Sequence, residues 1–279
     1  MPELPEVETI SRMLVSGGVD FPGIAGQVIT SAVVLWDRTI AAPGIAEFIE
    51  RIRGQKIEGT GRRGKFLIVR LAEDSLLIHL RMSGDLLIEM QGVELAPHHR
   101  LVLNLENGWR LAFNDPRKFG RVWLTSQPAE VLASLGPEPL ERSLTDAEFH
   151  RMLQGKSRQL KPLLMDQTFI AGLGNIYTDE ALHLARLHPL ILSNELSEDE
   201  SARLLASIRQ VLEGGILRNG TSIDWVYRGG EFQNYLRAYG RTGEPCPVCG
   251  TPIERIVIGQ RGTHYCPVCQ VRSLKEGGH

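Results

Sequence analysis

The stretch CPVCGTPIERIVIGQRGTHYCPVC (246–269) contains all four cysteines of the chain, arranged as two C-x-x-C pairs. The sixteen residues between the pairs match the spacing of a four-thiolate zinc site built on two turns. A redox dithiol would need only one pair, and two disulfides are disfavoured in a reducing compartment. Because four thiolates complete a tetrahedron, we expect one structural zinc ion and no open position for an activated water. The predicted ligands are Cys246, Cys249, Cys266 and Cys269.

The segment between the two pairs predicts a β-hairpin whose ends are fixed by the metal and whose tip is GQRG (259–262). Arg261 would then lie on a rigid tip, where a guanidinium is well placed to bind a phosphate. The alternative interpretation is an exposed turn residue that binds nothing.

Upstream of this module the pattern is helical. TDAEFHRMLQ (145–154) and the segment from Ser197 to Ile216 show helical periodicity, and the second begins with a serine and an acidic first turn. Between them, KPLLMDQ (161–167) and GLGNIYTDEAL (172–182) predict a helix, two turns and a helix. The free N–H groups at GLGN can receive an anion, although a tight turn without a ligand and plain helix packing are the alternatives.

Residues from Gln27 to about Thr125 have a β pattern, with runs such as KFLIVRL and RLVLNL, interrupted by one predicted helix from Ile45 to Arg53. Strands this close in sequence, without helical crossovers, predict antiparallel sheets packed as a sandwich. The predicted fold is therefore an α+β multidomain chain. Its parts are an N-terminal helix and β-sandwich (1–134), a helical domain (135–240), the zinc module (241–271) and a disordered tail (272–279).

The first ten residues, MPELPEVETI, predict a helix from Pro5 to about Ser16 that is preceded by a chemically distinctive terminus. Removal of Met1 would leave Pro2 with a secondary amine, and terminal amines have a pKa near ~7.7 to 8, so part of the population is a neutral nucleophile. Attack of such an amine on a sugar C1′ expels the base and forms an iminium, which acidifies the C2′ proton. Glu3 is placed to move protons, and Glu6 lies one helical turn further on. An ordered but inert terminus is the alternative.

DPRKFG (115–120) predicts a turn that carries Arg117 and Phe119 on one side. An exposed aromatic beside an arginine can wedge into a base stack, whereas the alternative is a phenylalanine that returns to the core.

The totals give little support to a nucleic-acid partner, since the net charge is -2, and any basic surface must be local. The longest apolar runs are far shorter than the ~20 residues that span a bilayer, and no signal peptide is visible, so we expect a cytoplasmic protein with no membrane contact.

The motifs PELPEVET, GRRGKFL, HLRMSG, DPRKFG, KPLLMDQ, GLGNIYTDEAL, YGRTGEPC and the paired CPVC occur in the order found in bacterial formamidopyrimidine-DNA glycosylases, and the resemblance runs over nearly the whole chain. It implies a β-sandwich, a helix-two-turn-helix domain and a zinc finger. It also implies a bifunctional base excision repair enzyme that removes 8-oxoguanine and formamidopyrimidines from double-stranded DNA and nicks the strand by β,δ-elimination. We expect a monomer that works at the nucleoid.

The resemblance also implies roles for individual residues. Pro2 would be the Schiff-base nucleophile, Glu3 the acid/base, and Lys65 a phosphate contact and proton donor. Arg261 would grip phosphates with Asn175 as its partner. Met82, Arg117 and Phe119 would fill the space left by the flipped nucleotide, with Arg117 facing the orphaned cytosine. Further DNA contacts are expected from His79, His98, Lys156, Gly172 and Gly174, with Arg158 as an alternative to Lys156.

The loop 221–236 would cover the extruded base, but it departs from the family pattern D-F-x-x-x-D-G, so its lesion contacts cannot be transferred. One alternative is an enzyme like endonuclease VIII, which acts on oxidised pyrimidines, but its usual start is PEGPE and this chain reads PELPE. A non-catalytic damage-binding zinc protein is a second alternative, which loss of Pro2 or Glu3 would have favoured.

Overall fold

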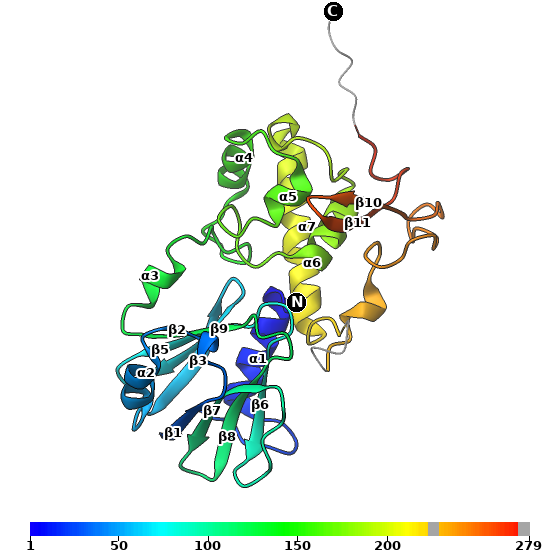
Figure 1. The fold of residues 1–279 in the computed structure, drawn as a ribbon. Helices are drawn as coiled ribbons and strands as arrows, with labels where there is room; N and C mark the ends of the chain where they lie inside the picture. The colour runs from blue at the N-terminus through cyan, green and yellow to red at the C-terminus, as the bar shows by residue number, and fades with distance from the viewer. Residues whose placement is uncertain (223–228, 273–279) are drawn as a thin grey trace, which may run out of the picture. The chain divides into compact units, whose positions relative to one another are not determined.

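A computed structural model describes residues 1–222 and 229–272 (Figure 1). The chain forms two compact units. The N-terminal unit comprises Met1–Ala133 and Asn219–Gly230, and the C-terminal unit comprises Ser134–Arg218 and Glu231–His279. Residues 223–228 of the predicted base-covering loop and residues 273–279 of the predicted tail lie outside the described residues.

Helix α1 (Leu4–Ser16) opens the N-terminal unit, one residue earlier than predicted. Leu4, Val7, Ile10 and Leu14 recur at helical spacing and are all buried, so one face of the helix lies in the core. The helix ends at Gly17, which has a φ of 74° that an L-residue rarely adopts.

Two β-sheets share one hydrophobic core with α1, which confirms the predicted sandwich. The first sheet has four strands, and every neighbouring pair is antiparallel. Its spatial order is β1 (Ile29–Val34), β7 (His99–Leu105), β8 (Trp109–Asn114) and β6 (Asp85–Met90).

The second sheet has five strands and is antiparallel except for its edge pair β2–β9, which is parallel. Its spatial order is β2 (Ile40–Ala42), β9 (Arg121–Thr125), β5 (Ser75–His79), β4 (Phe66–Leu71) and β3 (Ile57–Arg63). Strand β3 escaped prediction because its sequence, IEGTGRR, contains two glycines and two arginines and few strand-favouring residues. This unit also contains α2 (Ile45–Ile52), α3 (Pro128–Leu132) and a short 3-10 helix (Asp37–Thr39).

The C-terminal unit is helical, as predicted, and its helices begin at side-chain caps where the sequence supplies them. The hydroxyl of Thr145 accepts the Glu148 N–H at 3.2 Å, and that of Ser197 accepts the Glu200 N–H at 3.2 Å. The helices are α4 (Asp146–Gln154), α5 (Leu160–Leu164), α6 (Asn175–Ala185) and α7 (Glu198–Leu217), with 3-10 helices at Ser193–Glu195 and Phe232–Tyr235.

The predicted hairpin between the cysteine pairs is also present, as β10 (Glu254–Ile258) and β11 (Arg261–Tyr265). Its two turn residues, Gly259 and Gln260, have φ values of 54° and 63°, which is the left-handed geometry of a tight hairpin turn. Among the described helices, none combines the length and apolarity needed to cross a membrane.

Candidate functional site

The N-terminal end of α1 is fixed by one carboxylate. Glu6 accepts the backbone N–H of Glu3 through Oε2 at 2.7 Å, and its Oε1 accepts the N–H of Thr221 at 2.7 Å. Pro2 and Glu3 are buried, whereas Met1 is exposed. A Cβ on Gly220, whose φ is +80°, would lie 2.7 Å from Glu6 Oε1. Glu6 therefore ties the predicted nucleophile region to the start of the predicted base-covering loop, and glycine is needed for that close approach.

Lys65 lies in the tight turn between β3 and β4, where Gly64 has a φ of 55°. Its side chain is largely covered, with 5% of the residue exposed. The next residue, Phe66, pairs with His79 across β4 and β5, and their rings meet edge to face with centroids 4.8 Å apart. The GRRGK motif and the HL of HLRMSG are therefore neighbours in the sheet.

His79 accepts the N–H of Arg81 on Nδ1 at 3.1 Å, which leaves Nε2 to carry the proton of the neutral ring. Burial, together with the positive charges of Arg81 and Lys65, lowers the pKa of His79 to about 3. His79 is therefore a neutral hydrogen-bond donor at physiological pH, a form that suits a phosphate contact without adding a charge.

The DPRKFG turn is organised by Asp115, which sequence reasoning missed. Asp115 is 1% exposed, and its carboxylate accepts the Gly120 N–H at 2.7 Å and the Arg117 N–H at 3.2 Å. It also accepts the hydroxyl of Ser83, and Ser83 in turn accepts the Arg117 N–H at 3.1 Å. One buried carboxylate thus joins the HLRMSG turn to the DPRKFG turn.

This arrangement presents the predicted void-filling residues. Phe119 is 49% exposed, which excludes a return to the core, and the Arg117 guanidinium lies 5.0 Å from its ring centroid. Met82 is half-buried in the adjoining turn. His98 is exposed, and its carbonyl accepts the Asp115 N–H at 2.8 Å. Four predicted DNA contacts therefore lie on turns tied to one aspartate.

In the C-terminal unit, the side chain of Gln167 builds the GLGN turn. Its Oε1 accepts the Gly172 N–H at 2.9 Å, and its Nε2 donates to the carbonyl of Leu173 at 2.8 Å. Gly172 has a φ of 97°, and Gly174 precedes the first residue of α6, Asn175. The turn therefore delivers the N-terminal end of an eleven-residue helix, with the partial positive charge that favours anions.

Lys156 and Arg158, the two candidates in the GKSRQLK segment, have different surroundings. Lys156 is exposed. Arg158 forms an ion pair with Asp166 at 2.7 Å, and this guanidinium is the main reason that the pKa of Asp166 is lowered. The structure therefore favours Lys156 as the cation available for a phosphate.

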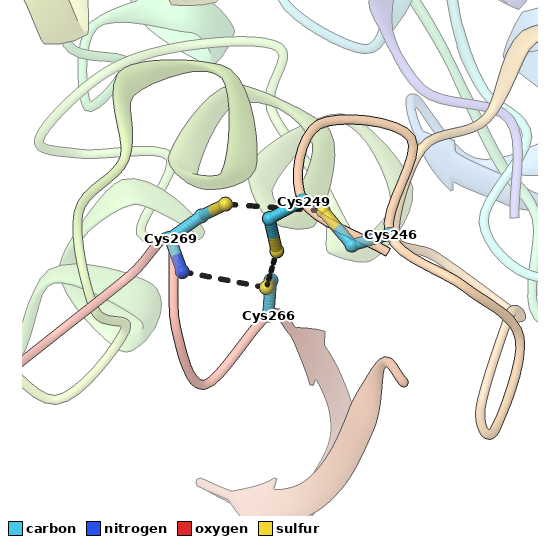
Figure 2. Close-up of side chains that lie close together, drawn as sticks. All are labelled: Cys246, Cys249, Cys266 and Cys269. Atoms are coloured by element: carbon cyan, nitrogen blue, oxygen red, sulfur yellow. Dashed lines mark hydrogen bonds between the residues drawn. The ribbon is translucent and has the colours of Figure 1, made fainter. Parts of the chain in front are cut away.

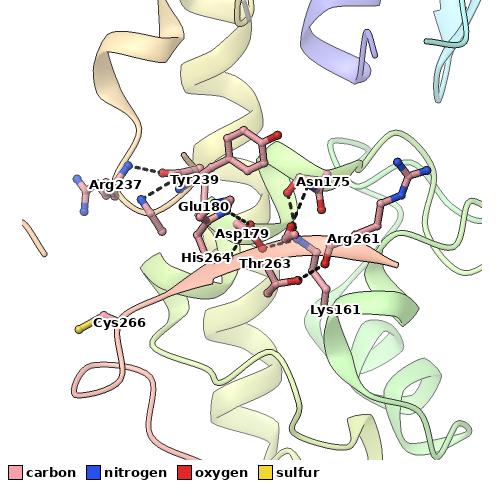
Figure 3. A network of polar contacts seen from close by, with 12 residues as sticks. Lys161, Asn175, Asp179, Glu180, Arg237, Tyr239, Arg261, Thr263, His264 and Cys266 are labelled. Carbon is pink, nitrogen blue, oxygen red and sulfur yellow. Dashed lines mark hydrogen bonds and ion pairs between the residues drawn. The ribbon is translucent and has the colours of Figure 1, made fainter. Parts of the chain in front are cut away.

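Arg261 begins β11 and is exposed, and the strand behind it is attached to α6 by buried polar contacts (Figure 3). Asn175 Nδ2 donates to the Gly262 carbonyl at 3.1 Å. Asp179 Oδ2 accepts the His264 N–H at 3.0 Å and contacts His264 Nδ1 at 3.2 Å. Asp179 also forms a buried ion pair with Lys161, whose Nζ donates to the Asn175 carbonyl at 3.2 Å. Arg261 is thus held at a defined place relative to Asn175.

A depression of about 310 Å³ lies beside Arg261 and contains three cationic side chains and one carboxylate. It is lined by Arg158, Lys161, Pro162, Met165, Asp166, Ile258, Gly259 and Arg261.

Glu180, the residue after Asp179 in α6, anchors a different segment of the same unit. Its carboxylate accepts the backbone N–H groups of residues 237–239 at 2.8 to 2.9 Å. Burial raises the pKa of Glu180. Asp179 and Glu180 are both buried, and the only sign of their roles in the sequence was that two acidic residues are consecutive in the helix.

The four cysteines form a candidate metal centre (Figure 2). Their sulfurs all lie within 4.8 Å of one another, with 3.5 Å between Cys249 and Cys266 and 3.9 Å between Cys246 and Cys269. A tetrahedral zinc with Zn–S bonds of about 2.3 Å requires S–S separations of about 3.8 Å, so this geometry fits the ion. Burial raises the pKa of the Cys269 thiol, and a bound cation would reverse this by stabilising the thiolate. The distances and the four thiolate donors therefore fit one structural zinc ion.

Three family models match the chain in order. They are the formamidopyrimidine-DNA glycosylase N-terminal domain (residues 1–122), the formamidopyrimidine-DNA glycosylase H2TH domain (135–226), and the zinc finger found in FPG and IleRS (243–271). The formamidopyrimidine-DNA glycosylase of Protochlamydia amoebophila is 42% identical over 279 residues, covering 97% of this chain and 99% of the relative.

Two solved structures have the same fold as this chain. The Lactococcus lactis Fpg (MutM) in complex with DNA containing N7-benzyl-Fapy-dG superposes with a TM-score of 0.90 at 37% identity, covering 97% of this chain and 100% of that one. MutM in complex with DNA containing carbocyclic 8-oxo-G has a TM-score of 0.90 at 36% identity, with the same coverage of 97% and 100%.

Proposed function

Since the chain belongs to the formamidopyrimidine-DNA glycosylase family, we propose that it excises oxidised purines from duplex DNA in base excision repair and then cleaves the strand at the abasic site. The observation that carries this proposal is the terminus of α1, where Glu6 fixes the backbone beside a buried Pro2 and Glu3. Such an arrangement presents a secondary amine and a carboxylate at one place once Met1 has been removed. The substrates are 8-oxoguanine and formamidopyrimidines.

We assign the chemistry to Pro2 and Glu3. The Pro2 nitrogen forms a bond to C1′ as the glycosidic bond breaks, and the base leaves with the bonding electron pair and gains a proton. Sugar ring opening then gives an iminium, with Glu3 moving the proton. Loss of the C2′ proton expels the 3′ phosphate, and a second elimination expels the 5′ phosphate. Lys65 would contact a phosphate and donate a proton during elimination.

We assign DNA binding to groups in both units. In the C-terminal unit, Arg261, Asn175, Lys156 and the N–H groups following Gly172 and Gly174 would bind phosphates. In the N-terminal unit, His79 and His98 would contact the DNA as well. Met82, Arg117 and Phe119 would replace the flipped nucleotide in the stack, a role that suits the exposed Phe119 ring.

The zinc ion supplies no reaction step in this proposal, because four thiolates leave it no open position. Its ligands close the base of the hairpin and thereby fix Arg261. We further propose that the protein acts as a monomer in the cytoplasm, at the nucleoid, with domain boundaries near residues 134, 240 and 271.

A substrate panel tests this function. The purified protein is incubated with matched duplexes that contain 8-oxoguanine, a formamidopyrimidine or thymine glycol opposite cytosine or adenine, and released base and strand cleavage are measured separately. We expect the two purine lesions opposite cytosine to be excised fastest. Preferential removal of thymine glycol would establish the endonuclease VIII-like alternative, and binding without base release would establish the non-catalytic one.

A further inference from the structure

One face of α6 contacts the zinc module through groups spaced four residues apart. Asn175 and Asp179 bind the hairpin, as described above, and His183 follows at the same interval. Residues four apart lie on one face of a helix, so these three side chains form a single row. Just after the helix, the backbone carbonyl of Leu187 makes a further contact with the zinc module. It accepts a hydrogen bond from Nε2 of Gln270 at 2.9 Å.

The row ends at the metal ligands. His183 Nε2 lies 3.3 Å from Sγ of Cys246, within hydrogen-bonding distance of a sulfur acceptor. Gln270 Oε1 accepts the N–H of Cys266 at 2.8 Å while its Nε2 bonds the Leu187 carbonyl. Each cysteine pair therefore has one member connected to α6 or to the turn that follows it.

The contact between His183 and Cys246 is shielded from water. His183 is 2% exposed and Cys246 is 3% exposed. Among the described residues, Nδ1 of His183 has no hydrogen-bond partner. A proton on Nδ1 would therefore be a buried donor with no acceptor, whereas a proton on Nε2 points at the sulfur.

We propose that His183 is an outer-sphere partner of the zinc site, in which its Nε2–H donates a hydrogen bond to the Cys246 thiolate and couples the metal to helix α6. Four thiolates around a divalent cation carry a net charge of -2, and burying that charge is unfavourable unless donors compensate it. A hydrogen bond donated to the Cys246 sulfur withdraws negative charge from it. The sulfur is then protonated more slowly and dissociates more slowly from the zinc. Groups of this kind commonly tune metal affinity by about 10- to 100-fold.

This inference rests on the zinc site and not on the proposed glycosylase activity, so either can fail without the other. It also gives α6 a second task. The helix that presents Asn175 to a phosphate at its first residue would stabilise the metal eight residues later, on the same face.

The test compares three substitutions in the intact, zinc-loaded protein. His183→Leu removes the donor, and His183→Gln keeps an N–H donor. His188→Leu is the control, since His188 is also buried and packs edge to face on Tyr265 with ring centroids 4.8 Å apart, but its Nδ1 accepts the N–H of Leu190 at 3.2 Å and not a sulfur. Zinc transfer to a chromogenic chelator is followed at neutral pH. We expect release about 10- to 100-fold faster for His183→Leu, much closer to wild type for His183→Gln, and within about threefold of wild type for His188→Leu.

Cobalt substitution supplies a readout that simple loosening would not change. Loss of the N–H donor makes the thiolate richer in electrons, so the thiolate-to-cobalt charge-transfer band of His183→Leu should move to longer wavelength, while that of His188→Leu stays in place. Wild-type release with an unshifted band in His183→Leu would overturn the proposal, as would equal acceleration in His188→Leu.

The wild-type protein gives an independent test if His183→Leu does not fold. Nitrogen-15 chemical shifts of the His183 ring in the zinc-loaded protein distinguish its two tautomers. A proton on Nε2 is expected, and a neutral ring protonated on Nδ1 would refute the hydrogen bond.

Discussion

The two turns that we propose to bind DNA, DPRKFG and the tip of the β10–β11 hairpin, are held in different ways. DPRKFG in the N-terminal unit is organised by Asp115 at the edge of an apolar β-sandwich core. The hairpin tip that carries Arg261 belongs to a small module whose buried core consists of Cys246, Ile253 and Cys266. The hairpin therefore depends on a metal and on buried ionic contacts, whereas the DPRKFG turn depends on hydrophobic packing and one carboxylate. Removing the metal or a buried charged group should therefore affect one turn and leave the other unchanged.

Removal of zinc should have the largest effect, and it should affect the hairpin but not the DPRKFG turn. Small four-cysteine modules fold on their metal, with apparent binding free energies of about 10 to 16 kcal/mol in peptides. Chelation under reducing conditions should disorder the hairpin and weaken DNA binding at least 100-fold, while amide protection in the β-sandwich persists. Re-addition of zinc is the control. Equal loss of protection in both units would show that their supports are not separate.

Asp179→Asn should have the next largest effect. It removes the charge of one partner of the buried ion pair with Lys161, and breaking such a pair typically costs about 3 to 5 kcal/mol. We expect faster hydrogen exchange at 261–265 and weaker DNA binding, with unchanged exchange in β8. Glu244→Gln is the matched control, because it removes a carboxylate from the exposed pair with Arg241, 2.8 Å apart, where less than about 1 kcal/mol is at stake. Similar losses in the two variants would argue against an anchoring role for Asp179.

Asp115→Ala should destabilise the DPRKFG turn, by less than Asp179→Asn destabilises the hairpin. It leaves the N–H of Gly120 and that of Arg117 without their carboxylate, and a buried unpaired donor costs about 1 to 3 kcal/mol. The expected outcome is reduced discrimination of the base opposite the lesion, with normal zinc content. Asp20→Ala, at an exposed acid of the same unit, should leave discrimination unchanged. Unaltered discrimination in Asp115→Ala would remove Asp115 from the account.

The smallest predicted effect is the contribution of His79 to the pH dependence of the N-terminal unit. The folded pKa of His79 is about 3 against an ordinary 6.5, so between these values the unfolded chain binds a proton that the folded chain does not. The free energy of unfolding should therefore fall as the pH drops below 6.5, by about 1 kcal/mol between pH 7 and 5.5 from this group alone. Tryptophan fluorescence during urea unfolding reports this unit, which contains Trp36, Trp109 and Trp123. The free energy of unfolding of His79→Gln should depend less on pH than that of the wild type. The same pH dependence in both proteins would show that His79 is not the titrating group.

Local patterns predicted much of the fold. Cysteine spacing indicated the metal site, closure at the metal and the GQRG tip indicated the hairpin, the GLGN turn indicated the start of α6, and helical periodicity indicated α1, α4 and α7. Each signal arises from residues that are neighbours in the chain. Strand β3 was missed because its role is set by pairing with β4 and not by its own propensity.

The residues that position the site could not be predicted in the same way. Asp179 and His264 are 85 positions apart, and Glu6 and Thr221 are 215 apart, so no local pattern connects them. Lys161 opens the segment KPLLMDQ, whose predicted helix gave no sign that this lysine would be buried, yet it is 0% exposed. The roles of Asp115, Asp179 and His183 follow only from tertiary contacts.

The most direct test of the central claim is hydride trapping at Pro2. The mature protein is incubated with an 8-oxoguanine:cytosine duplex and borohydride, and the adduct is digested and mapped by mass spectrometry. A reduced covalent bond between the Pro2 nitrogen and the sugar C1′ is predicted, and it should be absent in Pro2→Gly and in a form that retains Met1. No adduct, or an adduct that persists unchanged in Pro2→Gly, would contradict the account.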